Sequence, residues 1–175
     1  MAISSMFEAL VARGPALSLG KRAVTFDRLV GSWDVEVFDI ENDGAKRVTE
    51  GEWHFAWVLE GRALQDVLIV PRSADRHLEM SIKGNRYVTA LRMFDRVLDA
   101  WRIFFIDPLK GAYIAMVARI DTDKIVEEGH DLDGNLCRKV LSDLTDDSFR
   151  AREDVSQDDG ATWQETTEIL ARRAV

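Results

Sequence analysis

Residues 86–121 read RYVTALRMFDRVLDAWRIFFIDPLKGAYIAMVARID, and this stretch decides the fold. Apolar and polar side chains alternate along much of it, with turn signals at Arg96-Val97-Leu98-Asp99 and Asp107-Pro108. A period of two is typical of β-strands with one buried face, and short turns of this kind join antiparallel neighbours. The stretch therefore predicts three consecutive antiparallel strands.

Similar turn signals recur at roughly ten- to thirteen-residue intervals from Gly31 to the C-terminus. They are Asn42-Asp43-Gly44, Glu60-Gly61, Thr122-Asp123, Asp133-Gly134, Asp146-Asp147 and Asp159-Gly160. Because no run between them is long enough for a crossover helix, parallel strands are excluded. Closure removes the exposed edges of such a meander. We therefore predict an all-β fold, an antiparallel up-and-down barrel of about ten strands.

Helical signals are confined to the first thirty residues. Ser5 and Glu8 have the S-x-x-E spacing of a capping box, and Gly14-Pro15 ends that helix. A second helical turn is expected from about Phe26 to Val30. We predict a single domain in which residues 1–30 pack on a barrel formed by residues 31–175.

The amino-acid composition limits which binding partners and which cellular compartment are expected. The formal net charge of -8 repels nucleic acid and anionic membranes, so neither is an expected partner. Cys137 is the single cysteine, which rules out an internal disulfide. The N-terminal residues lack the pattern of a secretory leader, and no segment has the length of a membrane helix. A cytoplasmic location is the expectation.

Gly31-Ser32-Trp33 resembles the G-x-W motif of the lipocalin and fatty-acid-binding (calycin) superfamily. The resemblance implies a lipocalin-like barrel in which an arginine late in the last strand, Arg172 or Arg173, packs across the tryptophan. Four later segments, residues 59–66, 91–95, 101–102 and 107–108, are similar to a family of poorly characterised bacterial lipocalin-like proteins. That likeness implies the fold more than the function, because such barrels serve as carriers and as enzymes.

Residues 156–163 match the S-x-D-x-G-x-T-W pattern of an Asp box. In sialidase-type propellers the box recurs once in each blade, whereas this chain has one copy and lacks the length for a propeller. We therefore interpret it as a hairpin turn that the Asp158 side chain caps, with Trp163 packed beneath it.

Pairing residues across each turn assigns side chains to the two faces of the sheet. The apolar face is the predicted interior, and it carries a few charges: Arg92, Glu127, Arg138, Glu153 and Glu165. Lys139 and Asp154 fall on the solvated face. Around the Glu60-Gly61 turn, Arg62 and Asp66 join the interior charges if the Trp53-Phe55-Trp57 face is internal.

No strong catalytic motif is present. His54, His77 and His130 are isolated and Cys137 has no evident activating partner, so neither a metal site nor a cofactor is predicted. Burial is expected to raise the pKa of an interior glutamate, which favours Glu127 and Glu153 as acid or base. Arg138 is the predicted electrostatic partner. The predicted ligand-binding residues are Arg62, Asp66, Arg92, Trp57, Trp101 and Met116.

Two outer features complete the prediction. The outward residues of the central strands form an apolar patch, which the N-terminal helix or a second subunit of a homodimer can cover. The patch consists of Tyr87, Leu91, Met93, Phe104, Ile106, Tyr113 and Val117. The long connection from Pro71 to Arg86 is a candidate lid.

Three functions remain open. The favoured one is binding of a small molecule inside the barrel. The expected molecule is apolar or aromatic, and anionic ligands are among those expected. The alternative is a cofactor-independent isomerase, cyclase or lyase that uses the interior glutamates and arginines. The third is a structural or dimerisation module whose barrel is filled.

Overall fold

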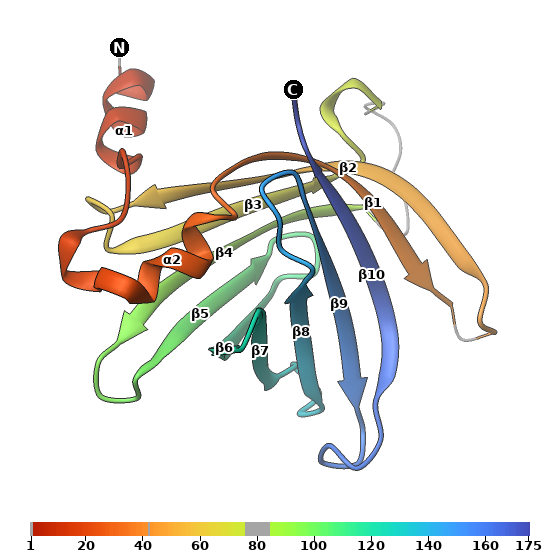
Figure 1. Cartoon of the computed structure of the whole chain (residues 1–175). Helices are drawn as coiled ribbons and strands as arrows, with labels where there is room; N and C mark the ends of the chain where they lie inside the picture. The colour runs from red at the N-terminus through yellow and green to blue at the C-terminus, as the bar shows by residue number, and fades with distance from the viewer. Residues whose placement is uncertain (1, 42, 76–84) are drawn as a thin grey trace.

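A computed structural model describes residues 2–41, 43–75 and 85–175. It confirms the predicted fold: ten antiparallel strands close into a barrel in the order β1-β10-β9-β8-β7-β6-β5-β4-β3-β2 (Figure 1). The strands are β1 (Gly31–Ile40), β2 (Lys46–Val58), β3 (Ala63–Val70), β4 (Arg86–Asp95), β5 (Ala100–Asp107), β6 (Ala112–Asp121), β7 (Lys124–His130), β8 (Leu136–Ser142), β9 (Ser148–Ser156) and β10 (Gln164–Arg173). Each strand pairs with its neighbours in the chain, and β1 pairs with β10 to close the sheet.

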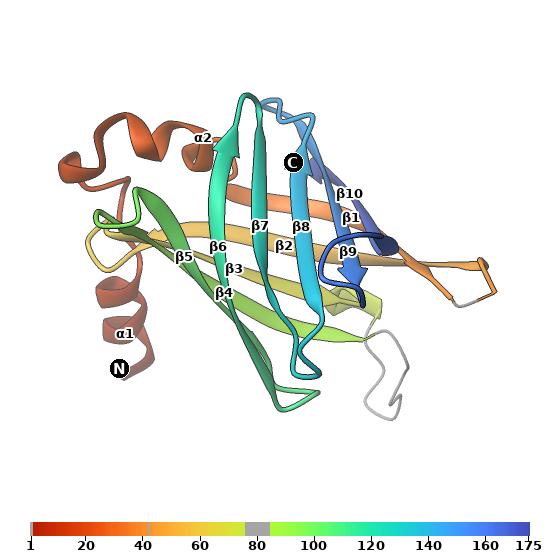
Figure 2. The same ribbon diagram turned by 90° about the horizontal axis from the view of Figure 1, so that it is seen from below.

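Three helical segments precede the barrel, α1 (Ala2–Leu10), the 3₁₀ segment η1 (Leu17–Ala23) and α2 (Val24–Asp27). Ser5 lies inside α1, so the capping box predicted from Ser5 and Glu8 is wrong. Figure 1 shows α1 projecting away from the barrel, and in Figure 2 α2 lies beside the ends of β6 and β7. Among the described residues, no helix has the length and apolar character needed to cross a bilayer.

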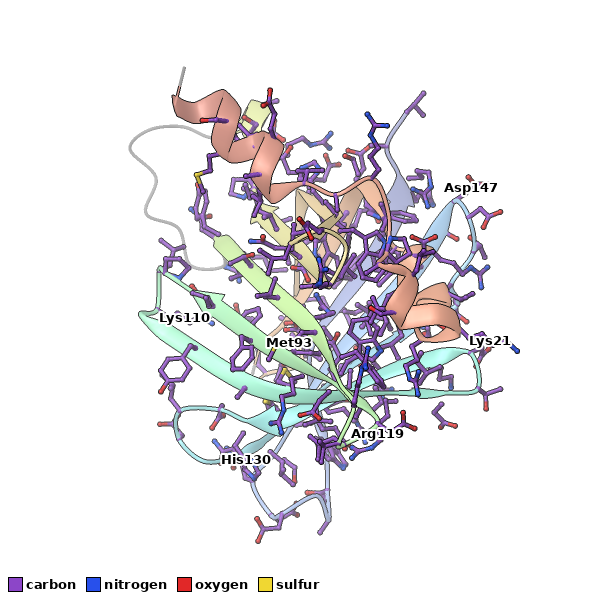
Figure 3. The ribbon with its side chains drawn as sticks, turned by 90° about the vertical axis from the view of Figure 1, so that its left-hand side faces the viewer. Lys21, Met93, Lys110, Arg119, His130 and Asp147 are labelled. Atoms are coloured by element: carbon purple, nitrogen blue, oxygen red, sulfur yellow. The ribbon has the colours of Figure 1, made fainter. Side chains whose placement is uncertain are left out.

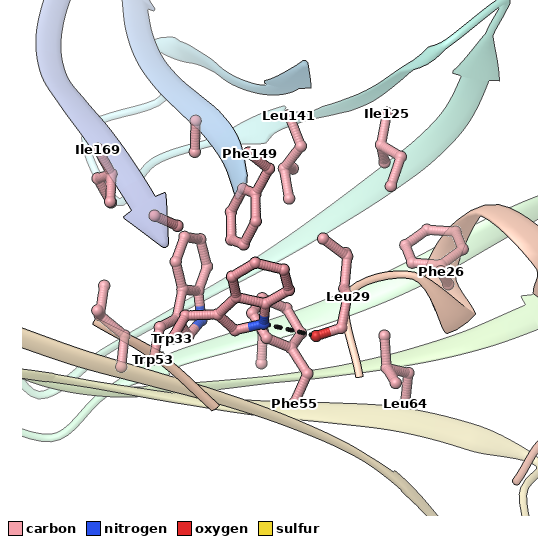
Figure 4. Packing of buried hydrophobic residues seen from close by; sticks show 14 of the residues in the cluster. Phe26, Leu29, Trp33, Trp53, Phe55, Leu64, Ile125, Leu141, Phe149 and Ile169 are labelled. Carbon is pink, nitrogen blue, oxygen red and sulfur yellow. Dashed lines mark hydrogen bonds between the residues drawn. The ribbon is translucent and has the colours of Figure 1, made fainter. Parts of the chain in front are cut away.

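One end of the barrel, where the odd-numbered strands begin, is filled by side chains. Phe26 of α2 is fully buried, with its ring centroid 4.6 Å from that of Trp101. The indole Nε1 of Trp57 donates to Oδ1 of Asp27 at 2.7 Å, which fastens α2 to β2. Leu29, Trp33 and their neighbours continue the same core (Figure 4). This end is therefore closed.

Trp33 and Arg173 reproduce the packing that the G-x-W resemblance implied. The Arg173 guanidinium lies 4.1 Å from the Trp33 ring centroid and donates from Nη1 to the Val30 carbonyl at 3.0 Å. Trp33 Nε1 donates to the Leu29 carbonyl at 2.7 Å (Figure 4). Gly31 has φ 131°, and a Cβ there would lie 2.5 Å from Arg173 Nη1, so glycine suits this position. Of the two arginines, Arg173 has the predicted role.

The register of β8 differs from the prediction. His130 pairs with Leu136, so five residues form the connection, and Gly134 within it has φ 83°. A connection with an odd number of residues shifts the pairing by one residue compared with a symmetric two-residue turn at Asp133-Gly134. Because strand side chains alternate, this shift turns Lys139 inward and Arg138 outward. The predicted interior position of Arg138 is wrong.

Two further irregularities affect the later strands. Asp143, with φ 54°, adds a residue before β9 and restores the predicted inward orientation of Glu153, which pairs with Lys139. A bulge between Glu165 and Thr167 reverses the parity of the residues before it. Glu165 consequently pairs with Asp154 on the outer face, and its predicted interior position is wrong.

The Asp box forms a turn, as predicted. Asp158 Oδ1 accepts hydrogen bonds from Ser156 Oγ and from the Thr162 backbone N–H, each at 2.8 Å. The Thr162 hydroxyl also donates to Asp158 Oδ2 at 2.6 Å, and this bond, with those from the Thr162 backbone and Ser156, lowers the pKa of Asp158 to about 2. Trp163 packs outside the barrel, with the Arg138 guanidinium 3.9 Å from its ring centroid.

Candidate functional site

A cavity of about 400 Å³ occupies the end of the barrel opposite the aromatic core. Figure 3 shows the two ends: Lys110 and His130 mark the cavity end, whereas Lys21 and Asp147 mark the closed end. The apolar lining residues are Leu68, Val88, Phe105, Ala112, Ile114, Met116 and Val155. The ionisable and polar ones are Asp39, Arg86, Asp107, Lys110, Asp131, Cys137, Arg138, Lys139, Glu153, Asp154, Thr166 and Thr167.

Lys139 and Glu153 form an ion pair at the inner part of this cavity. Lys139 Nζ lies 2.9 Å from Glu153 Oε1, and it also faces the rings of Trp53 and Phe105, with centroids at 5.7 and 5.3 Å. Burial acts to raise the pKa of Glu153, but the positive charges of Lys139 and Arg86 outweigh it and lower that pKa. Burial acts to lower the pKa of Lys139, but Glu153 and Glu127 together raise it. Both groups are therefore charged at neutral pH.

Arg86 and Asp39 form a second pair along the cavity wall. Arg86 donates to both carboxylate oxygens of Asp39, with Nη1 3.3 Å from Oδ2, and to Thr167 Oγ1 at 3.3 Å. Arg47 adds a contact to the same carboxylate at 2.7 Å. Burial opposes ionisation of Asp39, but the two arginines prevail and lower its pKa.

A third ionic cluster lies deeper in the barrel and is sealed from solvent. Arg92 contacts Asp66 and donates from Nε to Glu127 Oε1 at 2.9 Å. The Arg92 side chain is 1% exposed, and none of these three residues lines the cavity. The two carboxylates outweigh the effect of burial and raise the pKa of Arg92. This cluster joins β3, β4 and β7 across the interior.

The structure brings together some of the predicted site residues and separates others. Met116 and Glu153 line the cavity as expected. Arg138 is among the lining residues, but its guanidinium bonds to Asp154 at 3.1 Å and packs on Trp163. The predicted rise in the pKa of Glu153 is also wrong, since neighbouring cations lower it.

The remaining predicted residues lie away from the cavity. Trp57 and Trp101 belong to the core that fills the closed end. Arg62 is on the surface, with its side chain 64% exposed and paired with Glu60, so its predicted interior position is wrong. Leu59 and Glu60 both have positive φ, and this tight turn ends the alternation before Arg62.

Three of the four residues that form the two ion pairs of the cavity were missing from the sequence-based prediction. The sequence predicts Lys139 on the outer face, because the extra residue of the preceding loop carries no strong signal. Asp39 continues the inward alternation of Trp33, Val35 and Val37, and Arg86 continues that of Val88, so following the alternation to the strand ends would have found both.

In the described part of the chain, neither the Cys137 thiol nor a metal-binding cluster provides an alternative chemical site. Burial raises the pKa of the Cys137 thiol, which therefore stays protonated at neutral pH. Within residues 2–41, 43–75 and 85–175, no three His, Cys, Asp or Glu side chains are grouped to hold a metal ion. His77 and most of the predicted lid, residues 76–84, lie outside the described residues. A hollow beside Arg22 and Asp99 at the closed end is on the surface, since both side chains are more than half exposed.

The outer apolar patch is only partly covered. Met93, Phe104, Ile106 and Tyr113 are 40–71% exposed, so α1 does not cover them. Met93 is visible on the outer side of the sheet in Figure 3. Homodimerisation through this patch stays a prediction.

Comparison with known proteins adds information about the fold alone. No protein-family model matches the sequence, and no curated protein matches it. Among solved structures, the chain is similar to Rv2717c from M. tuberculosis, with a TM-score of 0.61, 12% identity, and coverage of 89% of this chain and 99% of that one. It is also similar to the S-type phycobiliprotein lyase CPES from Guillardia theta, with a TM-score of 0.55, 12% identity, and coverage of 88% and 93%. Both matches agree with the barrel fold described above.

Proposed function

We propose that this protein binds a small molecule with an apolar body and a polar group in the cavity at the open end of its barrel. The observation that carries the proposal is the contrast between the two ends. One end is filled by an aromatic core, whereas the other keeps a cavity of about 400 Å³. Small-molecule sites commonly have volumes of about 300–1,000 Å³ and are mostly apolar with a few polar groups.

The cavity is also an argument against a barrel whose only role is structural. Barrels of this size either fill their interior with side chains or hold one small ligand. Here Ile114 and Met116 of β6 are only partly buried although they point inward, because the cavity lies beside them. The Lys139–Glu153 pair costs desolvation energy, since the lysine side chain is 10% exposed, and a purely structural core does not require such a pair.

Binding is favoured over catalysis because neither predicted acid–base residue is suited to that role. Glu127 is enclosed with Arg92 and does not line the cavity. Glu153 lines the cavity, but its lowered pKa keeps it ionised and makes it a weak base near neutral pH. The lyase activity in the name of the CPES protein belongs to a barrel with 12% identity, so the likeness supports the shared fold.

Cavity filling tests the proposal with a matched control. Ile114→Trp places a larger side chain in the cavity, whereas Tyr113→Trp places the same residue on the outer face of the same strand, where Tyr113 is 71% exposed. The neutral fluorescent probe N-phenyl-1-naphthylamine is titrated into wild type and both variants. We expect saturable binding with one site per chain, lost or about tenfold weaker in Ile114→Trp and unchanged in Tyr113→Trp.

Two results would refute the proposal. One is the absence of saturable binding in the wild-type protein. The other is equal binding in both variants, which would place the probe on the outer apolar surface. Native mass spectrometry of protein purified from its own host complements the titration, because extra mass released on denaturation reports the natural ligand class directly.

A further inference from the structure

The ionic groups at the centre of the barrel do not balance. Three carboxylates, those of Asp66, Glu127 and Glu153, are in contact or in direct cross-strand register with two cations, Arg92 and Lys139. The formal charge of this central cluster is therefore 2 − 3 = −1 among the described residues. Arg92 serves Asp66 and Glu127 together, and Lys139 lies between Glu127 and Glu153 on adjacent strands.

A net charge at this depth is expensive, and it is poorly screened. Charges in a protein interior interact more strongly than at the surface because water is excluded, and an uncompensated buried charge lowers stability. The charges at the rim have less influence, because Lys110 is 79% exposed and screened by solvent. At the wall, Arg86 and Arg47 share the Asp39 carboxylate, so this group has a formal charge of +1. The two arginine side chains are 18% and 33% exposed, so solvent screens them better than the charges of the central cluster.

Glu153 is the member of the cluster that a ligand meets. Its side chain is 30% exposed, compared with 10% for Lys139, and it lines the cavity. The Lys139 ammonium is enclosed by Glu153 and by the rings of Trp53 and Phe105. A carboxylate has about four acceptor positions, and Oε1 of Glu153 uses one of them toward Lys139. Glu153 therefore has acceptor capacity directed at the cavity.

We propose that the ligand carries a protonated amine, which binds against Glu153 at the inner end of the cavity while its apolar body packs on the Ile114 and Met116 wall. This inference rests on the proposed function and specifies the sign of the ligand's charge. A cationic nitrogen neutralises the central cluster and gains charge-assisted hydrogen bonds. An anion at the same place adds to the negative charge. The net charge of -8 also raises the local concentration of cations around the molecule.

Three probes with the same apolar body test the sign: 1-naphthylmethylamine, 1-naphthalenemethanol and 1-naphthylacetic acid. Their affinities for the wild-type protein are measured by isothermal titration calorimetry at neutral pH. We expect the amine to bind about tenfold or more tightly than the alcohol, because hydrogen bonds to charged groups are worth roughly that factor. The acid should bind most weakly. This ranking needs no variant, so it remains informative if substitutions impair folding.

Two variants with the same change of net charge locate the effect. Glu153→Gln removes the carboxylate in the cavity, whereas Glu128→Gln removes one from the exposed outer face of β7, two strands away in the sheet. The preference for the amine over the alcohol should disappear in Glu153→Gln and persist in Glu128→Gln. Thermal melts of both variants confirm that they are folded before titration.

The outcomes separate this inference from the proposed function. If the alcohol or the acid binds as tightly as the amine, and Ile114→Trp abolishes that binding, the cavity binds ligands but the charge assignment is wrong. An amine preference that survives Glu153→Gln would likewise overturn the assignment. If none of the three probes binds saturably, the proposed function itself fails.

Discussion

Replacing Arg92 with methionine tests how the barrel interior tolerates its buried charges. The substitution keeps an unbranched apolar stem but leaves Asp66 and Glu127 without their shared cation. All three side chains are at most 4% exposed, so water cannot compensate. Breaking a buried ion pair by removing one partner typically lowers the free energy of unfolding by about 3–5 kcal/mol. For a chain of this length, that corresponds to a melting temperature lower by about 6–20 °C.

Urea unfolding of Arg92→Met at neutral pH measures this loss, and Arg102→Met is the matched control. Arg102 lies on the adjacent strand opposite Met93, is 44% exposed and pairs with Asp95 on the surface. Exposed pairs contribute little, so the control midpoint should hardly move. Equal losses in the two variants would refute the reasoning.

The pH dependence of the Arg92→Met deficit separates charge from packing. Without Arg92, the two enclosed carboxylates should have folded-state pKa values above their unfolded values of about 4. Groups of that kind destabilise the folded state at high pH, and the penalty disappears as the pH falls through the raised folded pKa toward the unfolded one. The deficit should therefore shrink between neutral pH and about pH 4. A deficit that stays constant over this range would show that lost packing, rather than charge, is responsible.

Three further predictions follow from individual contacts. Arg173→Ala should lower the free energy of unfolding by about 1–2 kcal/mol, because it removes a cation–π contact and hydrogen bonds to backbone carbonyls, whereas Arg172→Ala should have little effect in the same urea titration. Asp158→Ala should lower the melting temperature at pH 5–7. The pKa of Asp158 is depressed to about 2 in the folded protein, so its carboxylate stabilises the fold at pH values above the unfolded-state pKa and stops doing so as the pH falls through about 2. Thermal melts of variant and wild type should therefore converge at the acid end. Lys139→Met should destabilise the protein, because it leaves three carboxylates with one cation, whereas Glu153→Gln loses the ion pair but also removes the excess negative charge; a double-mutant cycle of the two should give a favourable coupling of about 1 kcal/mol or more, and additive effects would contradict the pairing.

Local sequence features determined the architecture. The period of two and the regular turn spacing after Gly31 predicted an antiparallel meander of about ten strands, and closure followed from the cost of open edges. Two short motifs also predicted their local structures, the contact between Trp33 and a terminal arginine and the turn capped by Asp158. The Asp158 turn is fixed by residues close in sequence, and the contact between Trp33 and Arg173 is fixed by the pairing of the first and last strands.

Only the tertiary structure decided which charges enter the barrel and where the cavity lies. Side chains alternate with a period of two, so the added residue before Leu136 exchanged Arg138 for Lys139 in the interior, and the bulge after Glu165 turned that carboxylate outward. The division into a filled and an open end depends on where Phe26 of α2 packs, which is a long-range contact. The sequence alone determines the strands, because their periodicity is local. The cavity and its charges depend on register and on packing between distant segments, which no local pattern contains.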